Sequence, residues 1–155
     1  MQAKFMQRAI DLAVENVRQA RGGPFGAVIV RDGEIIAEGT NLVTSSNDPT
    51  AHAEVVAIRR ACQHAGNFEL TDCDLYTSCE PCPMCLGAVY WTRVRNLYFA
   101  ANREDAADIG FDDSLIYNEL NVAHDDRIIP AVNVMRDEAL LAFREWSDST
   151  TKVRY

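Results

Sequence analysis

The sequence has no apolar run approaching the about 20 residues that a membrane-spanning helix needs. Its first five residues also lack the apolar core and small-residue cleavage site of a secretory signal. Repeats and low-complexity tracts are absent, and nearly half of the residues are hydrophobic, as in ordinary globular proteins. We therefore expect a folded protein that stays in the cytoplasm and makes no membrane contact.

Basic residues are scarce and form no run. The chain has 15 Lys and Arg against 23 Asp and Glu, which gives a formal net charge of −8. Such a charge repels a phosphate backbone unless basic residues gather on one face. A nucleic-acid partner is therefore disfavoured, and a small-molecule substrate is expected.

Cysteine is also sparse, but its distribution is uneven. There are five cysteines, an odd number, and three of them lie in one short segment: Cys79, Cys82 and Cys85. That clustering favours a metal or reactive site over a secreted disulfide scaffold. The length of 155 residues favours a single domain over 1–155.

Apolar and turn residues predict alternating helices and strands. Asp32-Gly33 lies between two β-rich runs and is typical of a tight hairpin. The predicted order is a helix at 3–20, antiparallel strands at 27–30 and 35–37, a helix capped by Thr50, a strand at 74–78, a helix beginning between Pro81 and Pro83, and a strand at 94–101. This alternation is typical of an α/β layered sheet.

The last third of the sequence is less regular. Residues 102–127 are acidic and poorly periodic, and long stretches of this kind are more often functional than idle. Residues 128–135 predict a last strand, which Pro130 would place at a sheet edge because proline donates no backbone hydrogen bond. A helix at 137–146 and a polar tail at 147–155 follow.

Two short motifs carry the chemistry. His52-Ala53-Glu54 supplies an imidazole and a carboxylate, and Pro81-Cys82-Pro83-Met84-Cys85 supplies two thiols. Three nitrogen or sulfur ligands with an open position for water are what catalytic zinc requires. Glu54 is then left to carry protons. Because both halves are predicted at helix starts, the helix dipoles would favour thiolates at one shared point.

Other interpretations of these motifs remain open at this stage. Cys79 and Cys82 form a competing pair with the same spacing, and a lone pair of cysteines can be redox-active or half of a structural zinc site. The non-enzymatic alternative is a structural zinc module that binds a partner. Gly22-Gly23 and Gly26 do not make a phosphate loop, because the Gly-Lys-Ser/Thr ending is missing.

Together the motifs resemble those of the cytidine deaminase superfamily and, within it, the bacterial guanine deaminases. The resemblance covers essentially the whole chain, through Gly22–Ala27, Thr50–Glu54, Thr77–Cys85 and Gly110–Asp113. Only the last of these segments and the tail favour guanine, since cytosine and tRNA-adenosine deaminases share the others. The resemblance implies a three-layer αβα sandwich with a five-stranded mixed sheet. It also implies a homodimer in which the C-terminal segment, 137–155, is exchanged between subunits.

The resemblance also implies roles for individual residues. One Zn²⁺ per subunit would be held by His52, Cys82 and Cys85, and Glu54 would shuttle protons. The base would be held by Asn41, Phe25, Asp113 and Tyr155.

Each contact to the base has an ordinary structural alternative. A carboxylate accepts hydrogen bonds from guanine's ring N–H and amino groups, so Asp113 is a candidate selector. Asp113 could instead cap a helix that begins at Ser114. Phe25 and Trp91 are candidates for stacking on the base, and such aromatics are as often core residues. Glu119 is a candidate second proton carrier, although a solvated helix face is the more common reason for such a residue.

The sequence hypothesis is therefore zinc-dependent hydrolytic deamination of guanine to xanthine and ammonia, without an organic cofactor. Deamination of cytosine or of tRNA adenosine is the alternative within the same superfamily.

Overall fold

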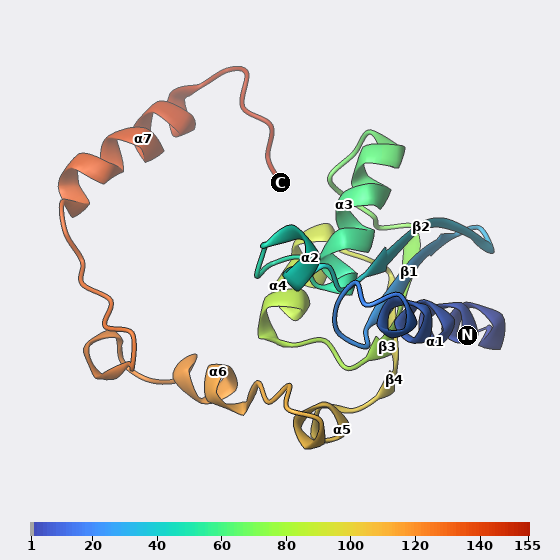
Figure 1. Ribbon diagram of the computed structural model, residues 1–155. Coiled ribbons are helices and arrows are strands. Elements are labelled where there is room, and N and C mark those ends of the chain that lie inside the picture. The colour runs from blue at the N-terminus through green and yellow to red at the C-terminus, as the bar shows by residue number, and fades with distance from the viewer. Residues whose placement is uncertain (1) are drawn as a thin grey trace. The chain divides into compact units, whose positions relative to one another are not determined.

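The computed structural model describes residues 2–155, and among these residues four strands form one mixed sheet (Figure 1). The strand order is β2-β1-β3-β4. The first pairs, β1 with β2 and β1 with β3, are antiparallel, and β3 with β4 is parallel. The strands are β1 (Gly26–Arg31), β2 (Glu34–Thr40), β3 (Cys73–Cys79) and β4 (Asn96–Ala101).

The hairpin between β1 and β2 confirms the sequence prediction. Its two loop residues, Asp32 and Gly33, have φ values of +50° and +80°. Positive φ at both positions is the requirement of a type I′ turn, which asparagine, aspartate and glycine tolerate best. The Asp-Gly pair therefore fixes the register of the first two strands.

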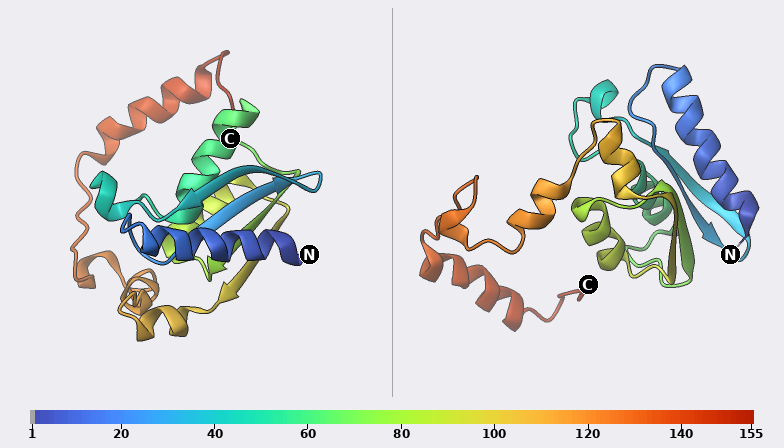
Figure 2. Two further views of the ribbon diagram at one scale, coloured as in Figure 1. Left: turned by 45° about the vertical axis from the view of Figure 1, so that its right-hand side comes forward. Right: turned by 90° about the horizontal axis from the view of Figure 1, so that it is seen from below.

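Helices cover both faces of the sheet, as the layered prediction required (Figure 2). On one face, α1 (Ala3–Arg18) packs its Phe5 and Leu12 against Val28 and Tyr76. On the other face, α3 (Ala53–Ala65) and α4 (Pro83–Thr92) pack around Ile29. Alternate residues of β1 thus enter opposite layers, because side chains of a strand point alternately to its two faces.

The start of α3 lies against the end of β2. A Cβ atom built on Gly39 would lie 2.2 Å from the carbonyl oxygen of Ala53 and 2.5 Å from the backbone nitrogen of Ala57. Only glycine allows this approach without a shift of backbone atoms. Ala53 lies between His52 and Glu54, so Gly39 determines how closely both residues approach the sheet.

The beginning of α3 corrects one prediction. Its N-cap residue is His52 and not Thr50, whose hydroxyl instead donates to Asp48 at 2.7 Å. Residues 51 and 52 precede the helix as extended chain, and the carbonyl of Ala51 accepts a hydrogen bond from Leu42 at 2.9 Å. Pairing with the loop after β2 therefore delays the helix by two residues.

The rest of the chain consists of short helices and a final longer one. The first compact unit, Met1–Asp113, also contains α2 (Val43–Ser46) and α5 (Arg103–Asp108). The second unit, Ser114–Tyr155, contains α6 (Ser114–Glu119), a 3₁₀ turn (His124–Asp126) and α7 (Arg136–Asp148). No residue of 114–155 is buried.

The prediction of a fifth strand is wrong. Residues 128–135 adopt no strand, and their apolar side chains are exposed, with Ile129 81% and Val132 74% accessible. A strand needs a neighbour to accept and donate its backbone hydrogen bonds, and the second unit contains no other strand. The sheet therefore has four strands and not five.

Membrane-spanning structure was not expected, and no helix in residues 2–155 is both long enough and apolar enough to cross a bilayer.

The close approach at Gly39 generates a prediction. Gly39→Ala is expected to destabilise the protein by about 1–3 kcal/mol, because an added methyl group in a filled site forces backbone shifts. It is also expected to reduce bound zinc, because the start of α3 moves. Denaturant unfolding and elemental analysis measure the two effects.

Gly87→Ala is the matched control, since a Cβ at Gly87 meets no atom within 4 Å. It is expected to leave stability unchanged or slightly raised, because alanine favours a helix over glycine. Equal stabilities of the Gly39→Ala variant and the wild type would contradict the proposed close contact.

Candidate metal centre and active site

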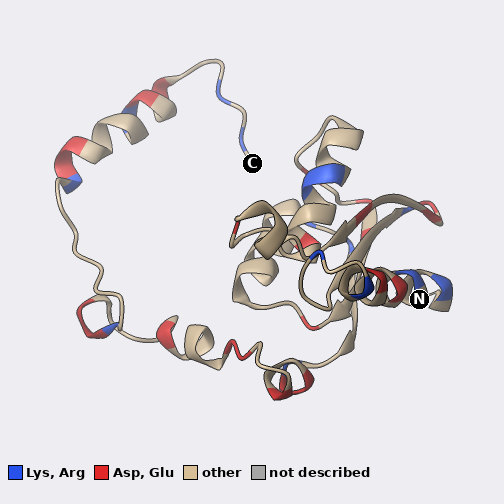
Figure 3. Ribbon diagram, in the orientation of Figure 1, with Lys and Arg blue, Asp and Glu red and all other residues tan. Residues whose placement is uncertain are grey.

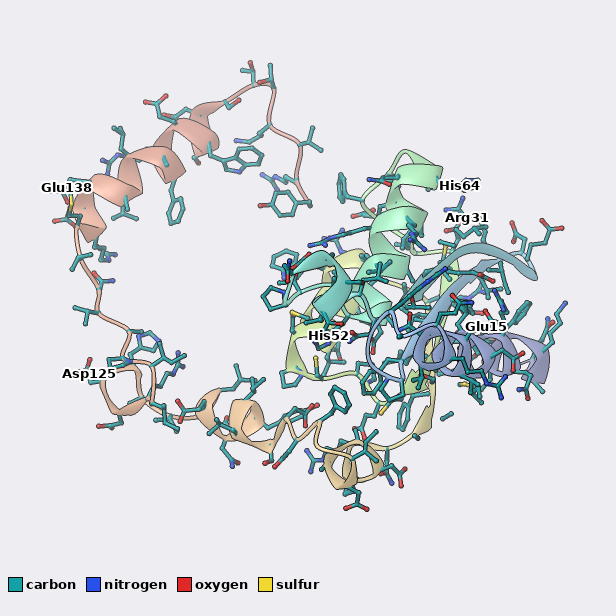
Figure 4. All side chains as sticks on the ribbon, in the orientation of Figure 1. Glu15, Arg31, His52, His64, Asp125 and Glu138 are labelled. Atoms are coloured by element: carbon teal, nitrogen blue, oxygen red, sulfur yellow. The ribbon has the colours of Figure 1, made fainter. Side chains whose placement is uncertain are left out.

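Three side chains from two helix starts meet at one point. Among the described residues, His52, Cys82 and Cys85 form a group whose potential ligand atoms all lie within 4.8 Å of one another. His52 is the N-cap residue of α3, Cys82 is the N-cap residue of α4, and Cys85 is buried in the first turn of α4. In Figure 4, His52 is labelled at the start of α3, beside α4.

The sheet explains why the two helices begin together. Gly26 at the start of β1 pairs with Thr40 at the end of β2, and neighbouring Ala27 pairs with Thr77 near the end of β3. The ends of β2 and β3 therefore lie at the same edge of the sheet. The segments after them lead into α3 and α4, so the helix starts converge there.

The geometry fits tetrahedral zinc. His52 Nδ1 lies 3.5 Å from Cys82 Sγ and 3.4 Å from Cys85 Sγ. Ligands of a tetrahedral ion with Zn–N near 2.0 Å and Zn–S near 2.3 Å are separated by about 3.5 Å. The donor set of one imidazole and two thiols is also one that zinc prefers. His52, Cys82 and Cys85 are therefore positioned to hold the ion.

The pKa values of the two cysteines are shifted in opposite directions. The hydrogen bond with Cys85, together with the neighbouring His52, holds the pKa of Cys82 well below its usual range. The hydrogen bond to Cys82 and burial raise the pKa of Cys85. The hydrogen bond with Cys82 raises the pKa of His52 in turn. Zinc would bind both cysteines as thiolates, so metal binding and loss of the thiol protons are coupled.

Glu54 lies beside these ligands in a buried position. Its side chain is only 6% exposed, and burial raises the pKa of its carboxyl group. Oε2 accepts a hydrogen bond from Cys85 Sγ at 3.5 Å, and Oε1 accepts one from the Thr77 hydroxyl at 3.3 Å. A carboxyl group with a raised pKa next to a metal site is suited to accept and return a proton near neutral pH.

Phe25 and Asn41 lie along the same edge of the sheet. The Asn41 backbone N–H donates to the carbonyl of Phe25 at 3.1 Å, and Leu42 donates to Ala51, the neighbour of His52. Asn41 is buried, and its Oδ1 accepts from the backbone N–H groups of Gly23 and Val43 at 3.4 and 3.3 Å. These two bonds engage the amide oxygen of Asn41, so that its Nδ2 is the group left to donate to a ligand.

The segment before α6 is also connected to this region. Phe111 contacts Phe25 edge-to-face with 4.9 Å between ring centroids. Asp113 is half-buried, and its pKa is raised by loss of hydration and, to a lesser degree, by the negative charge of Cys82. Asp113 therefore lies within electrostatic range of the metal ligands.

Three other predicted site residues are exposed or engaged locally. Trp91 lies in the last turn of α4 and is 65% exposed. In the second unit, Glu119 Oε2 accepts a hydrogen bond from the Ile128 backbone at 2.8 Å, and Tyr155 is 69% exposed. The roles predicted for these three residues stay predictions.

The competing thiol, Cys79, lies outside the ligand group. Its Sγ donates to the carbonyl of Asn102 at 3.5 Å, and burial raises its pKa to about 11. Position and not pKa therefore separates Cys79 from Cys85, which lies within the ligand group.

Sequence inspection missed Asn16 and Thr77. Asn16 occupies the last buried position of α1, whereas the neighbouring apolar residue Val17 is 51% exposed. Its Nδ2 donates to the carbonyls of Gly23 and Asn41 at 2.9 and 2.8 Å. The available signal was an amide on an otherwise apolar helix face.

The ligand assignment generates a prediction. Cys82→Ser and Cys85→Ser are each expected to lose most bound zinc, because a serine hydroxyl stays protonated and supplies no anionic ligand. Cys79→Ser, the matched control from the same segment, is expected to keep one zinc per chain. Elemental analysis after gel filtration measures this. Zinc loss confined to the Cys79→Ser variant would contradict the assignment.

Comparisons with known proteins agree with this centre. Residues 1–101 match the family described as the cytidine and deoxycytidylate deaminase zinc-binding region. Guanine deaminase of Bacillus subtilis is 56% identical over 151 residues, or 97% of each chain. A tRNA-specific adenosine deaminase of Haemophilus influenzae is 40% identical over 126 residues, which cover 77% of this chain and 72% of that one. The X-ray structure of Bacillus subtilis guanine deaminase aligns with a TM-score of 0.97 and 55% identity, covering 100% of this chain and 99% of that one. The chain therefore belongs to the zinc-binding cytidine and deoxycytidylate deaminase family, as a relative of the bacterial guanine deaminases.

Proposed function

We propose that this protein catalyses the zinc-dependent hydrolytic deamination of guanine to xanthine and ammonia. The observation that carries the proposal is a buried Glu54 beside a His/Cys/Cys ligand group, in a chain 56% identical to a guanine deaminase over nearly its full length. The reaction consumes one water: the C2–amino bond breaks, the water oxygen becomes the C2 carbonyl oxygen, and ammonia leaves. Atoms balance without an oxidant, a reductant or an organic cofactor.

When bound, zinc supplies Lewis-acid chemistry that lowers the pKa of water to about 7. His52, Cys82 and Cys85 hold the ion. Their fixed positions at two helix starts leave the side facing Glu54 for the reactants.

Glu54 moves the protons. Its Oε2, on the side of Cys85, accepts a proton from the attacking water, delivers it to the ring nitrogen beside C2, and assists departure of the amine. Burial supports this role, because it raises the pKa of the carboxyl group and so strengthens it as a base.

Asn41 and Asp113 select the base. The Asn41 amide, held through Oδ1, presents Nδ2 to an acceptor on the purine edge. The Asp113 carboxylate accepts from ring N–H or amino donors, which guanine presents in a different pattern from adenine or cytosine. Phe25 and Trp91 stack on the ring. Glu119 assists proton transfer.

The similarity to tRNA-specific adenosine deaminases makes a tRNA substrate the second candidate. Charge disfavours it. Figure 3 shows Lys and Arg separated along the chain and interspersed with acidic residues, and the net charge is −8. A polyanionic substrate would meet repulsion that a free base does not.

A substrate panel tests the proposed function. Free guanine, adenine, cytosine and a tRNA anticodon stem-loop are incubated with the zinc-loaded protein, and ammonia release is measured. Guanine is expected to release ammonia and form xanthine, with at least about 10²-fold lower kcat/KM for the other substrates. Preference for the stem-loop or for cytosine would refute guanine as substrate.

The control for this panel is Glu54→Gln, a variant of nearly equal shape. It is expected to keep zinc and to lose about 10²–10⁴-fold in turnover, the usual contribution of a positioned proton carrier. Undiminished turnover would eliminate the role of Glu54.

We also propose that the protein is a homodimer in which residues 137–155 are exchanged and cover the partner's site. The Ser114–Tyr155 unit supports this, because it buries no residue and exposes apolar side chains such as Ile129 and Phe143, at 81% and 70%. Large apolar side chains exposed in such number are more often covered by a partner than left in water. Exchange of the C-terminal unit would bury it and complete one deaminase domain over 1–155.

Removal of Tyr155 tests the tail. Deletion is expected to raise KM for guanine by about 10-fold or more, because an aromatic contact and exclusion of water are lost. Tyr155→Phe, which keeps the ring, is the control and is expected to retain most affinity. Light scattering after gel filtration measures whether the protein is dimeric. Unchanged guanine turnover in the deletion variant would contradict the covering role.

A further inference from the structure

We propose that the Thr77 hydroxyl is a positioning group for Glu54, which holds one carboxylate oxygen so that the other faces the metal ligands. This inference rests on the proposed function, in which Glu54 carries the proton.

Thr77 interrupts an apolar series of β3. Cys73 and Leu75 on alternate positions pack into the core cluster beneath α3 and α4, whereas Tyr76 packs on the α1 side. Thr77 continues the first series, is only 1% exposed, and carries a hydroxyl where its predecessors are apolar. Burying a hydroxyl is unfavourable unless it makes a hydrogen bond. Its recorded side-chain partner is Glu54.

The two oxygens of Glu54 have different neighbours. Thr77 Oγ1 donates to Oε1 at 3.3 Å from the strand side, and Cys85 Sγ donates to Oε2 at 3.5 Å from the ligand side. A thiolate that binds zinc has no proton to donate. A Cys85 thiolate would not donate to Oε2, whereas the Thr77 hydroxyl carries a proton to donate to Oε1 with or without a metal. The hydroxyl is then the side-chain donor that keeps Oε2 directed at the reactants.

Thr77 is itself held firmly. Its strand is interior, and Thr77 pairs with Ala27 on β1 and with Phe99 on β4. The β-branched side chain also has few χ1 rotamers. Glu54, by contrast, has a flexible side chain at the first turn of α3. A rigid donor aimed at a flexible acceptor fixes the acceptor's orientation, which matters for proton transfer and not for affinity for the base.

The experiment compares Thr77→Val, which keeps the shape and removes the hydroxyl, with Thr77→Ser, which keeps the hydroxyl. Thr77→Val is expected to lower kcat for guanine by about 10- to 100-fold, because misplacing a catalytic group by about 1 Å costs that much. KM is expected to stay within about twofold. Zinc content and Tm are expected to match the wild type, since valine suits a buried strand. Thr77→Ser is expected to restore kcat to within about threefold of the wild type.

Crystal structures of the zinc-bound wild type and of the Thr77→Val variant give a readout independent of turnover. The Glu54 carboxylate is expected in one orientation in the wild type, and displaced or split between rotamers in the variant.

Several results would overturn the inference. One is a Thr77→Val variant with wild-type kcat or an unmoved carboxylate. Another is an equal loss in Thr77→Val and Thr77→Ser, or zinc loss in Thr77→Val, either of which would indicate a merely structural role. Failure of the proposed function is distinguishable, because the wild type itself would then not release ammonia from guanine, while the crystal structures would still decide the orientation of Glu54.

Discussion

The starts of α3 and α4 meet where His52 Nδ1 lies 3.5 Å from Cys82 Sγ, and the chemistry of the protein depends on this contact. Both residues occupy N-cap positions, and within residues 2–155 neither side chain caps its own helix. A serine, threonine, asparagine or aspartate there would stabilise each helix by about 1 kcal/mol. The two helices lack this contribution, because both side chains are directed at the shared ligand group instead. Local helix stability is thus given up for function, as is common at active sites.

The convergence of the two helices follows from the sheet. Because β2 and β3 both run antiparallel to β1, their C-terminal ends lie at the same end of the sheet. The helices that follow them, α3 and α4, therefore begin near each other. Gly39 then lets α3 lie against β2 more closely than any other residue would allow. Small residues in the strand therefore set the positions of groups that react, although they touch no substrate.

Burial gives Glu54 its chemical character. A carboxylate removed from water is unfavourable, so the pKa of Glu54 rises and the group binds a proton more readily. The Thr77 hydroxyl donates to its Oε1 at 3.3 Å. The same low-polarity surroundings strengthen this hydrogen bond. Burial of Glu54 therefore accounts both for the firm position of its carboxyl group and for its raised proton affinity.

Much of the fold could be predicted from local patterns. The helix at 3–20, the Asp-Gly hairpin, the strand at 74–78 and the helix after Pro83 depend on residues close together in sequence, and the structure confirms them within a few residues. The Thr50 cap and the strand at 128–135 were wrong. Each of these two predictions depended on hydrogen bonds with residues distant in the sequence. Leu42 donates to the carbonyl of Ala51 and delays the start of α3, whereas residues 128–135 have no strand beside them to pair with.

The sequence by itself determined the ligand types, their spacing and the reacting carboxylate, because His-x-Glu and Cys-x-x-Cys at helix starts leave few chemical alternatives. Only the tertiary structure decided that Cys85 and not Cys79 joins the ligand group, that Asn16 holds Asn41, and that Thr77 reaches Glu54. Those contacts join residues 23 to 33 positions apart in the chain. No local pattern encodes such contacts, because they arise only when packing brings separate elements together.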